Sequence, residues 1–279
     1  MISIVILTKN EEKDLPGCLE SVSWSDDIVV YDSYSDDKTI EIAESYGARV
    51  VRRQFDNWSS HQNWGLRNIQ FKNDWVFYID ADERMSPELV KSVQSAVTSP
   101  DDCVAFRVER RDFWGQAWLK RVQASSYYIR LFKPEFISYE RLVNPVTIVD
   151  GKCGDVNGFL NHYPFSKGVN HWLDRHNSYS SFEAQQIVES ELHAEASFFT
   201  LLGKGLTVKD FNQRRSYQKA LFYRLPARPV VKFLLFYLIR MGFLDGVAGL
   251  RYSILQSIYE YMIVLKVKEM NSGLDRAGT

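Results

Sequence analysis

The sequence predicts an α/β fold: a mostly parallel β-sheet with helices on both faces, followed by a helical C-terminal region. In roughly the first hundred residues, short apolar runs alternate with stretches whose apolar residues recur at helical spacing. From about residue 171 onward the pattern is helical. Such an alternation is typical of parallel strands joined by helices, so the sheet belongs to the first part of the chain.

The expected elements follow one another in a regular order. Apolar runs predict strands at 4–7, 28–31, 49–52 and 75–79. Stretches of helical spacing lie between them, at 11–22, 39–46 and 58–69. Gly47 ends the second helix, and Ser86 followed by Pro87 begins another, as an N-cap and a first helical residue. A less regular and more strand-like region covers 104–161.

Length and composition indicate one large α/β domain with an appendage. The chain has 279 residues, and we expect a catalytic domain over 1–165 and a helical region over 166–279. The formal net charge is −1, which predicts no nucleic-acid partner. Three cysteines without CxxC spacing predict reduced thiols in a cytoplasmic protein, not a disulfide framework or a zinc site.

Polar clusters follow three of the predicted strands. They cover residues 8–12, 32–37 and 80–83. In open α/β sheets, ligands bind beyond the carboxyl ends of the strands. We therefore expect the three clusters to meet in one crevice, although each alone also fits a helix cap.

The sharpest feature is Asp80-Ala81-Asp82, directly after a predicted buried strand. Carboxylate oxygens suit Mg²⁺ or Mn²⁺, which bridge to diphosphate oxygens. Such an ion neutralises the charge that builds on a nucleoside-diphosphate leaving group. The alternative for this motif alone is a solvated loop after a strand.

Several segments together resemble glycosyltransferase family 2, especially its branch of lipopolysaccharide-core β-glucosyltransferases and exopolysaccharide enzymes. The segments that carry the resemblance are 4–12, 29–39, 80–83, 128–132, 161–165, 176–180 and 242–250. They span nearly the whole chain.

The resemblance implies a GT-A fold and transfer of a sugar with inversion of configuration. It implies a nucleoside-diphosphate sugar as donor, with a UDP-hexose favoured, and a lipid-linked or lipopolysaccharide-type glycan as acceptor. It places Asp80 near the ribose and the metal, and Asp82 on the metal. The residues that it places around the base and ribose are Thr8, Asn10, Glu11 and Asp32, and those on the helix that flanks the base are Gln62, Asn63 and Arg67.

Two further residues are candidates from their own chemistry. His162 follows a predicted strand, and its imidazole either completes the metal site or is a hydrogen-bonded structural histidine. Arg130 either counters a diphosphate or an anionic acceptor, or forms a buried ion pair.

The catalytic base is the least defined group. An inverting transfer needs a carboxylate to take the proton of the acceptor hydroxyl. Related sequences often carry an acid in the region of 142–145, or shortly before 128, where this chain has Ser125 and Ser126. Neither position holds an acid here. We assign the base to Glu140, and the alternatives are Asp112, Asp150 and Asp155.

The segment 204–240 predicts contact with a membrane surface. It carries nine basic residues against one acid, Asp210, with aromatic residues between them. Its uncharged stretch 233–239 is seven residues long, whereas a membrane-spanning helix needs roughly 20. We expect peripheral attachment at the cytoplasmic face of the membrane. The alternative is a packed helical subdomain with a solvated basic face.

Two other functions stay open. A sugar-1-phosphate nucleotidyltransferase needs a glycine-rich loop after the first strand, and residues 8–12 contain no glycine. A binding or scaffold protein with a decayed catalytic site would account for the acids missing near 126 and 144.

Overall fold

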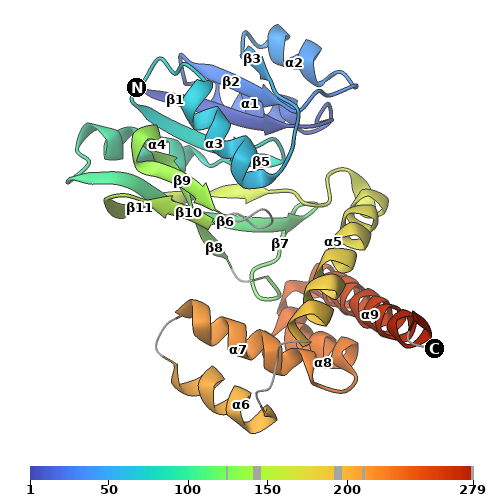
Figure 1. The fold of residues 1–279 in the computed structure, drawn as a ribbon. Coiled ribbons are helices and arrows are strands. Elements are labelled where there is room, and N and C mark those ends of the chain that lie inside the picture. Colours follow the sequence, from blue (N-terminus) through green and yellow to red (C-terminus); the bar gives the residue numbers. More distant parts are fainter. Residues whose placement is uncertain (124, 141–145, 192–196, 209–210, 278–279) are drawn as a thin grey trace. The chain divides into compact units, whose positions relative to one another are not determined.

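The structure is a computed structural model that describes residues 1–123, 125–140, 146–191, 197–208 and 211–277. The chain forms two compact units (Figure 1). One consists of Met1–Trp118 with Ala124–Lys167, and the other of Leu119–Gln123 with Gly168–Thr279. The expected division after residue 165 stays a prediction about functional domains.

The first unit contains all the strands among the described residues. Its strands are β1 (Ile2–Thr8), β2 (Ile28–Asp32), β3 (Arg49–Arg52), β4 (Trp75–Asp80), β5 (Glu83–Met85), β6 (Cys103–Trp114), β7 (Ala117–Trp118), β8 (Ser126–Phe132), β9 (Ile137–Glu140), β10 (Val146–Val149) and β11 (Lys152–His162). Its helices are α1 (Leu15–Val22), α2 (Thr39–Ser45), α3 (Trp58–Asn68), α4 (Pro87–Thr98) and the 3₁₀ turn η1 (Pro134–Phe136).

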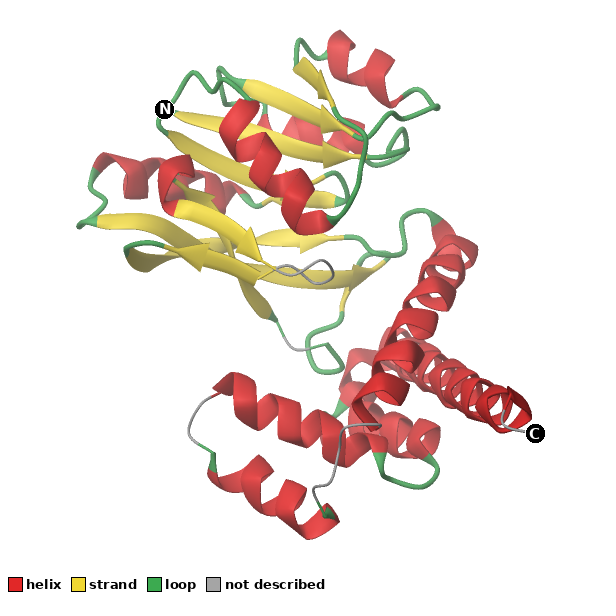
Figure 2. Cartoon of the chain, in the orientation of Figure 1, coloured by secondary structure: helices red, strands yellow, loops and turns green. Residues whose placement is uncertain are grey.

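The main sheet is mixed, with more parallel than antiparallel pairings along its path. Its order is β3-β2-β1-β4-β8-β6-β11-β5, with β7 paired to β6, while β9 and β10 form a separate hairpin (Figure 2). The first four strands are parallel neighbours, and so are β6 and β11. Strand β8 runs antiparallel between β4 and β6. The predicted α/β fold is thus confirmed.

Each face of the sheet carries its own core. On one face, β1 residues such as Ile4 and Ile6 pack with side chains of α1, α2 and α4. On the other face, Val5 and Tyr78 pack with side chains of α3 and the β9–β10 hairpin. Alternation along the strands produces this division, because successive side chains point to opposite faces.

The helix starts follow from local capping. Ser86 Oγ accepts the N–H of Leu89 at 3.1 Å, so Ser86 is the N-cap of α4, as expected. Asn57 caps α3 in the same way, with its Oδ1 2.9 Å from the N–H of Ser60. These caps fix where α3 and α4 leave the strand ends.

The second unit is helical, as predicted. It comprises α5 (Gly168–Glu191), α6 (Phe198–Thr207), α7 (Phe211–Tyr223), α8 (Arg228–Leu234), the π-helical turn η2 (Leu235–Ile239), the 3₁₀ turn η3 (Gly242–Asp245) and α9 (Gly246–Ala277). The guanidinium of Arg228 forms a buried ion pair with Glu260 at 2.6 Å, which joins α8 to α9. Within the described residues, no single helix is long and apolar enough to cross a membrane. The helical segments Arg228–Ile239 and Gly242–Gly273 are long and apolar enough only when taken together, and the chain bends by 71° between them.

Candidate functional site

The carboxyl ends of the parallel strands meet at one edge of the sheet. In the strand register, Thr8 pairs with Asp32, and its neighbour Leu7 pairs with Asp80. The clusters at 8–12, 32–37 and 80–83 therefore lie at one edge, as the sequence predicted.

Asp32 is held rigidly at this edge. Its side chain is fully buried. Its carboxylate accepts hydrogen bonds from Thr8 Oγ1 at 2.9 Å and from the Ser35 N–H at 2.8 Å. Thr8 and Asp32 are thus brought together, and the loop after β2 is fixed by the residue that ends the strand.

Asn10 and Glu11 join the loop after β1 to the loop after β2. Asn10 adopts a left-handed backbone with φ 56°, its N–H donates to Ser35 Oγ, and its Oδ1 accepts the Asp36 N–H at 3.0 Å. Glu11 Oε1 lies 2.5 Å from Lys167 Nζ. Glu11 Oε2 is buried and has no hydrogen-bond partner among the described residues. Burial raises the pKa of Glu11 to about 7, although Lys167 lowers it.

Asp80 is held by a buried arginine. Nη2 of Arg130 lies 2.7 Å from Asp80 Oδ2 and 2.7 Å from Glu83 Oε1. Glu83 is fully buried, and its Oε2 accepts the Asp80 N–H at 3.1 Å. Burial lowers the pKa of Arg130, but the charges of Glu83 and Asp80 outweigh burial and raise it well above its ordinary value. Arg130 thus forms a buried ion pair in the structure, and its role toward a diphosphate stays a prediction.

Asp82, His162 and Asp112 form a row of contacting side chains near the ion pair that Arg130 makes with Asp80 and Glu83. His162 Nε2 lies 3.3 Å from Asp82 Oδ2, and His162 Nδ1 lies 2.6 Å from Asp112 Oδ1. Burial lowers the pKa of His162, but the two carboxylates more than reverse this and raise it to about 9. The Tyr163 N–H donates to the Asp82 carbonyl at 2.9 Å, which ties the end of β11 to the loop after β4.

The three predicted metal ligands are therefore divided. Asp82 and His162 face each other, while Asp80 faces Arg130. In the described part of the chain, no group of three or more His, Cys, Asp or Glu side chains is arranged to hold a metal ion. A carboxylate oxygen fits Mg²⁺ or Mn²⁺, which take their remaining ligands from water and substrate phosphates, and the imidazole of His162 can join it only in its neutral form.

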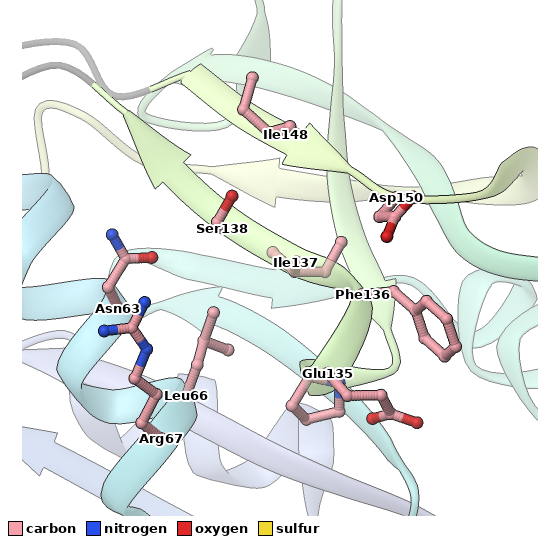
Figure 3. A pocket seen from close by; sticks show the side chains of 10 residues that line it. Asn63, Leu66, Arg67, Glu135, Phe136, Ile137, Ser138, Ile148 and Asp150 are labelled. Carbon is pink, nitrogen blue, oxygen red and sulfur yellow. The ribbon is translucent and has the colours of Figure 1, made fainter.

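The three predicted residues of α3 lie in different surroundings. Gln62 is buried, and its Oε1 has no partner among the described residues. The side-chain amide of Asn63 exchanges two hydrogen bonds with the Tyr139 backbone, both 2.8 Å long. Arg67 is exposed and lines a pocket of about 540 Å³ together with Asn63 and Phe136 (Figure 3).

This pocket lies away from the site edge. It is bounded by η1, which follows Phe132, and Phe132 pairs with Val76 at the beginning of β4. Asp80 ends the same strand. The structure therefore does not bring Arg67 together with the residues at the carboxyl edge.

The four acids considered as catalytic base are also dispersed. Glu140 is exposed at the end of β9. It is followed by 141–145, which lie outside the described residues and include one of the two regions where related sequences carry an acid; the other region, at Ser125 and Ser126, is described and holds no acid. Asp150 lines the pocket of Figure 3, and Asp155 pairs with Arg107 at 2.8 Å. Asp112 contacts His162.

Sequence reasoning did not assign a role to Glu83 or Lys167. The position of Glu83 directly after Asp82 marks it as a possible site residue. Its inward orientation cannot be predicted from that position, because it depends on Arg130. Lys167 lies beyond the last strand, and its Nζ bonds Glu11 and the Asn10 carbonyl only because the chain returns to the first loop. Asp112 was considered only as a base.

Several known proteins similar to this chain are named glycosyltransferases. "Uncharacterized glycosyltransferase RT0209" of Rickettsia typhi is 26% identical over 97% of this chain and 87% of its own length. The lipopolysaccharide core biosynthesis glycosyltransferase LpsC of Rhizobium meliloti is 25% identical over 97% of this chain and 93% of its own. Among solved structures, S. aureus TarS aligns with 14% identity over 91% of this chain and 54% of its own, with a TM-score of 0.42.

The family model named "Glycosyl transferase family 2" matches residues 3–194. This match covers more than two thirds of the 279 residues, including every residue at the carboxyl edge of the sheet. The chain belongs to glycosyl transferase family 2.

Proposed function

We propose that this chain is an inverting hexosyltransferase that uses a UDP-sugar and Mg²⁺ or Mn²⁺. The proposed acceptor is a lipid-linked or lipopolysaccharide-type glycan precursor at the cytoplasmic face of the membrane. The observation that carries the proposal is the Asp82–His162 pair, 3.3 Å apart, at the sheet edge that also holds Asp32. The similarity to LpsC, over nearly the whole of both chains, supports the acceptor class.

The nucleoside is proposed to bind at the loops after β1 and β2. Glu11 Oε2 and Gln62 Oε1 are buried acceptors without a partner among the described residues. Buried acceptors of this kind are costly unless a donor reaches them. Ribose hydroxyls and the N–H of a uracil ring are such donors. Thr8, Asn10 and Asp32 would then shape the loops that receive the nucleoside.

The diphosphate is proposed to bind beside Asp82. Asp82 and His162 would hold the metal ion, which when bound neutralises the charge on the departing nucleoside diphosphate. Asp112 orients His162 through the 2.6 Å contact at Nδ1. Arg130 keeps Asp80 in place, so that the Asp80 carboxylate stays available at the strand end next to the ribose.

Inversion requires the acceptor hydroxyl to attack the anomeric carbon from the face opposite the leaving group. A carboxylate must take the proton of that hydroxyl as the new bond forms. We propose Glu140 for this role, because it is exposed at the end of β9 and forms no ion pair with another described residue. Glu140→Gln would then abolish transfer while UDP binding remains.

The donor site is tested by thermal unfolding with UDP-, GDP-, TDP- and CMP-sugars, each with and without Mn²⁺. A ligand that binds only the folded state raises the melting temperature; at a hundredfold excess over its dissociation constant it adds about 2.7 kcal/mol. We expect stabilisation by UDP-sugars that depends on Mn²⁺ and is lost in Asp82→Ala. Asp155→Ala is the matched control, because it removes a carboxylate from β11 at an exposed ion pair.

The outcomes separate the alternatives. No stabilisation by any nucleotide sugar would overturn the proposal. Stabilisation without transfer or hydrolysis of the donor would favour a binding protein with a decayed catalytic site. Loss of binding in both Asp82→Ala and Asp155→Ala would mean that the effect comes from general destabilisation and not from the site.

A further inference from the structure

The second unit exposes a line of apolar side chains along one face of α9. Residues separated by seven, four, three and four positions fall on the same face of a helix. Each is between 42% and 63% exposed: Val247, Ile254, Ile258, Tyr261 and Leu265. At about 1.5 Å per residue, this line extends over about 27 Å.

The turn that leads into α9 continues the exposed apolar surface. Its exposed members are Leu238, Ile239, Met241, Phe243 and Leu244, which are between 42% and 72% exposed. We call these residues, together with the five on α9, the apolar ridge. So many exposed apolar side chains in one place indicate a surface that meets an apolar partner.

Internal packing uses the other sides of α9. Tyr252, Ser253 and Ile263 are buried within the helical unit. Lys266 reaches α5, where its Nζ lies 2.7 Å from Asn177 Oδ1 and 2.8 Å from Ser180 Oγ. The ridge is thus the face that the contacts of the second unit leave uncovered.

The charges around the ridge are mostly basic. Between 228 and 269 the chain has three acids, Asp245, Glu260 and Glu269. Asp245 Oδ2 accepts the backbone N–H groups of Arg121 and Val122 at 2.8 Å each, and Glu260 is buried against Arg228. Asp245 and Glu260 are therefore engaged inside the unit, whereas Glu269 is exposed beside Lys268.

The exposed charges that accompany the ridge are basic, except for Glu269 near the end of α9. The basic charges belong to Arg240, at the turn, and to Arg251 and Lys268, on α9. Arg251 lies within the line itself, four residues after Val247 and three before Ile254. An apolar surface bordered by positive charge is complementary to the interface of an anionic bilayer. A second copy of the chain would instead bring like charges together.

We infer that the apolar ridge docks the enzyme onto a membrane surface that contains anionic lipids. The inference rests on the proposed function only in that a lipid-linked acceptor gives the docking its purpose. It differs from the expectation for 204–240, because Lys219 pairs with Glu183 and Arg228 is buried. The contact is proposed for the turn and α9, where apolar and basic side chains are exposed together.

The test is co-sedimentation of the full chain with vesicles, without donor or acceptor. We expect binding to phosphatidylcholine vesicles that contain phosphatidylglycerol, and little binding to phosphatidylcholine alone. Leu244→Ser/Val247→Ser should weaken vesicle binding by about tenfold or more. Arg251→Gln should weaken it by about fivefold and reduce its salt dependence. The matched control is Val146→Ser/Ile148→Ser, which removes two exposed apolar side chains from β10 in the first unit.

Each other outcome overturns the inference. The inference would be overturned if the wild-type chain stays in the supernatant with anionic vesicles. It would also be overturned if the ridge and control variants lose vesicle binding equally. A wild-type dimer that becomes monomeric in the ridge variant, without vesicle binding, would show that a second copy covers the ridge. UDP-induced stabilisation of the same variants, measured without vesicles, tests the proposed function separately, so either can fail alone.

Discussion

Nδ1 of His162 lies 2.6 Å from Asp112 Oδ1, and the opposite nitrogen of the same ring faces Asp82. A histidine that ligates a metal commonly bonds a carboxylate through its other nitrogen, which sets the orientation of the ring. Asp112 is itself held by Arg110, whose Nε lies 3.2 Å away. The ring of His162 is therefore oriented from β6, before any ligand arrives.

Asp112→Asn should weaken metal binding without removing a ligand. The neutral amide holds the ring less firmly and makes the imidazole a poorer donor, so we expect Mn²⁺ affinity in the presence of UDP to fall by about tenfold or more. The measurement is Mn²⁺ titration followed by electron paramagnetic resonance, which does not depend on turnover. Asp155→Asn, on the exposed pair with Arg107, should leave the affinity unchanged. Equal affinities in wild type and Asp112→Asn would refute the orienting role.

Arg130→Met should destabilise the first unit strongly. The substitution leaves Glu83 buried without its 2.7 Å partner, and breaking a buried ion pair in this way typically costs about 3–5 kcal/mol. Urea unfolding followed by tryptophan fluorescence measures the change. Adding Glu83→Gln should recover part of the loss, because no charge is then left buried.

The ion pair of Arg107 with Asp155 is the comparison for the ion pairs of Arg130. It is also an arginine–aspartate contact between strands, but both side chains are about half exposed. Arg107→Met should therefore change the free energy of unfolding by no more than about 1 kcal/mol. Similar losses for the two arginine variants would mean that burial is not what makes Arg130 important.

The sheet and the position of its site were predictable because both follow from local pattern. Apolar runs such as 4–7 and 75–79 became β1 and β4, and polar residues directly after them came to one edge. The region after 104 was harder to divide. Strand β8 lies between β4 and β6 through antiparallel pairing, and that pairing depends on contacts far apart in the sequence.

The details of the site depended on such distant contacts. Nothing near Glu83 shows that it turns inward, since its partner Arg130 is 47 residues away. Arg67 was misplaced for a different reason. It lies on the helix that the resemblance assigns to the base-binding region, but five residues beyond Gln62. At about 1.5 Å per residue this separates the two by about 7.5 Å along the axis, toward the amino ends of the strands.

His61 should make the first unit sensitive to acid. Its ring is buried against Tyr31, with ring centroids 4.2 Å apart, and its Nδ1 lies 3.0 Å from Arg53 Nη1. Burial, reinforced by the Arg53 charge, lowers the pKa of His61 from 6.5 to about 4. Between these values the unfolded state binds more protons, so stability falls as pH drops from about 6.5 to about 4.

The size and origin of that acid effect can be measured. His61 contributes at most about 3 kcal/mol across this window. Urea midpoints at several pH values should fall more steeply for wild type than for His61→Gln, whatever the two proteins' stabilities at neutral pH. Parallel pH profiles would show that His61 titrates alike in the folded and unfolded states.

Gly158→Ala should be much more damaging than Gly47→Ala, although both glycines have a positive φ. At Gly158, with φ +86°, a Cβ would lie 2.3 Å from the backbone nitrogen of Leu89, whereas at Gly47, with φ +73°, it would meet nothing within 4 Å. Gly47→Ala therefore carries only the left-handed backbone cost of about 1–2 kcal/mol. In Gly158→Ala the cost of pushing α4 away from β11 is added, for a total of about 2–5 kcal/mol.

The Gly158 substitution should also affect the site. Because Ser86 at the start of α4 bonds the Phe159 backbone, the damage should spread along β11 toward His162 and lower Mn²⁺ affinity as well. Equal losses in urea unfolding for the two variants would show that α4 and β11 adjust to the added methyl group.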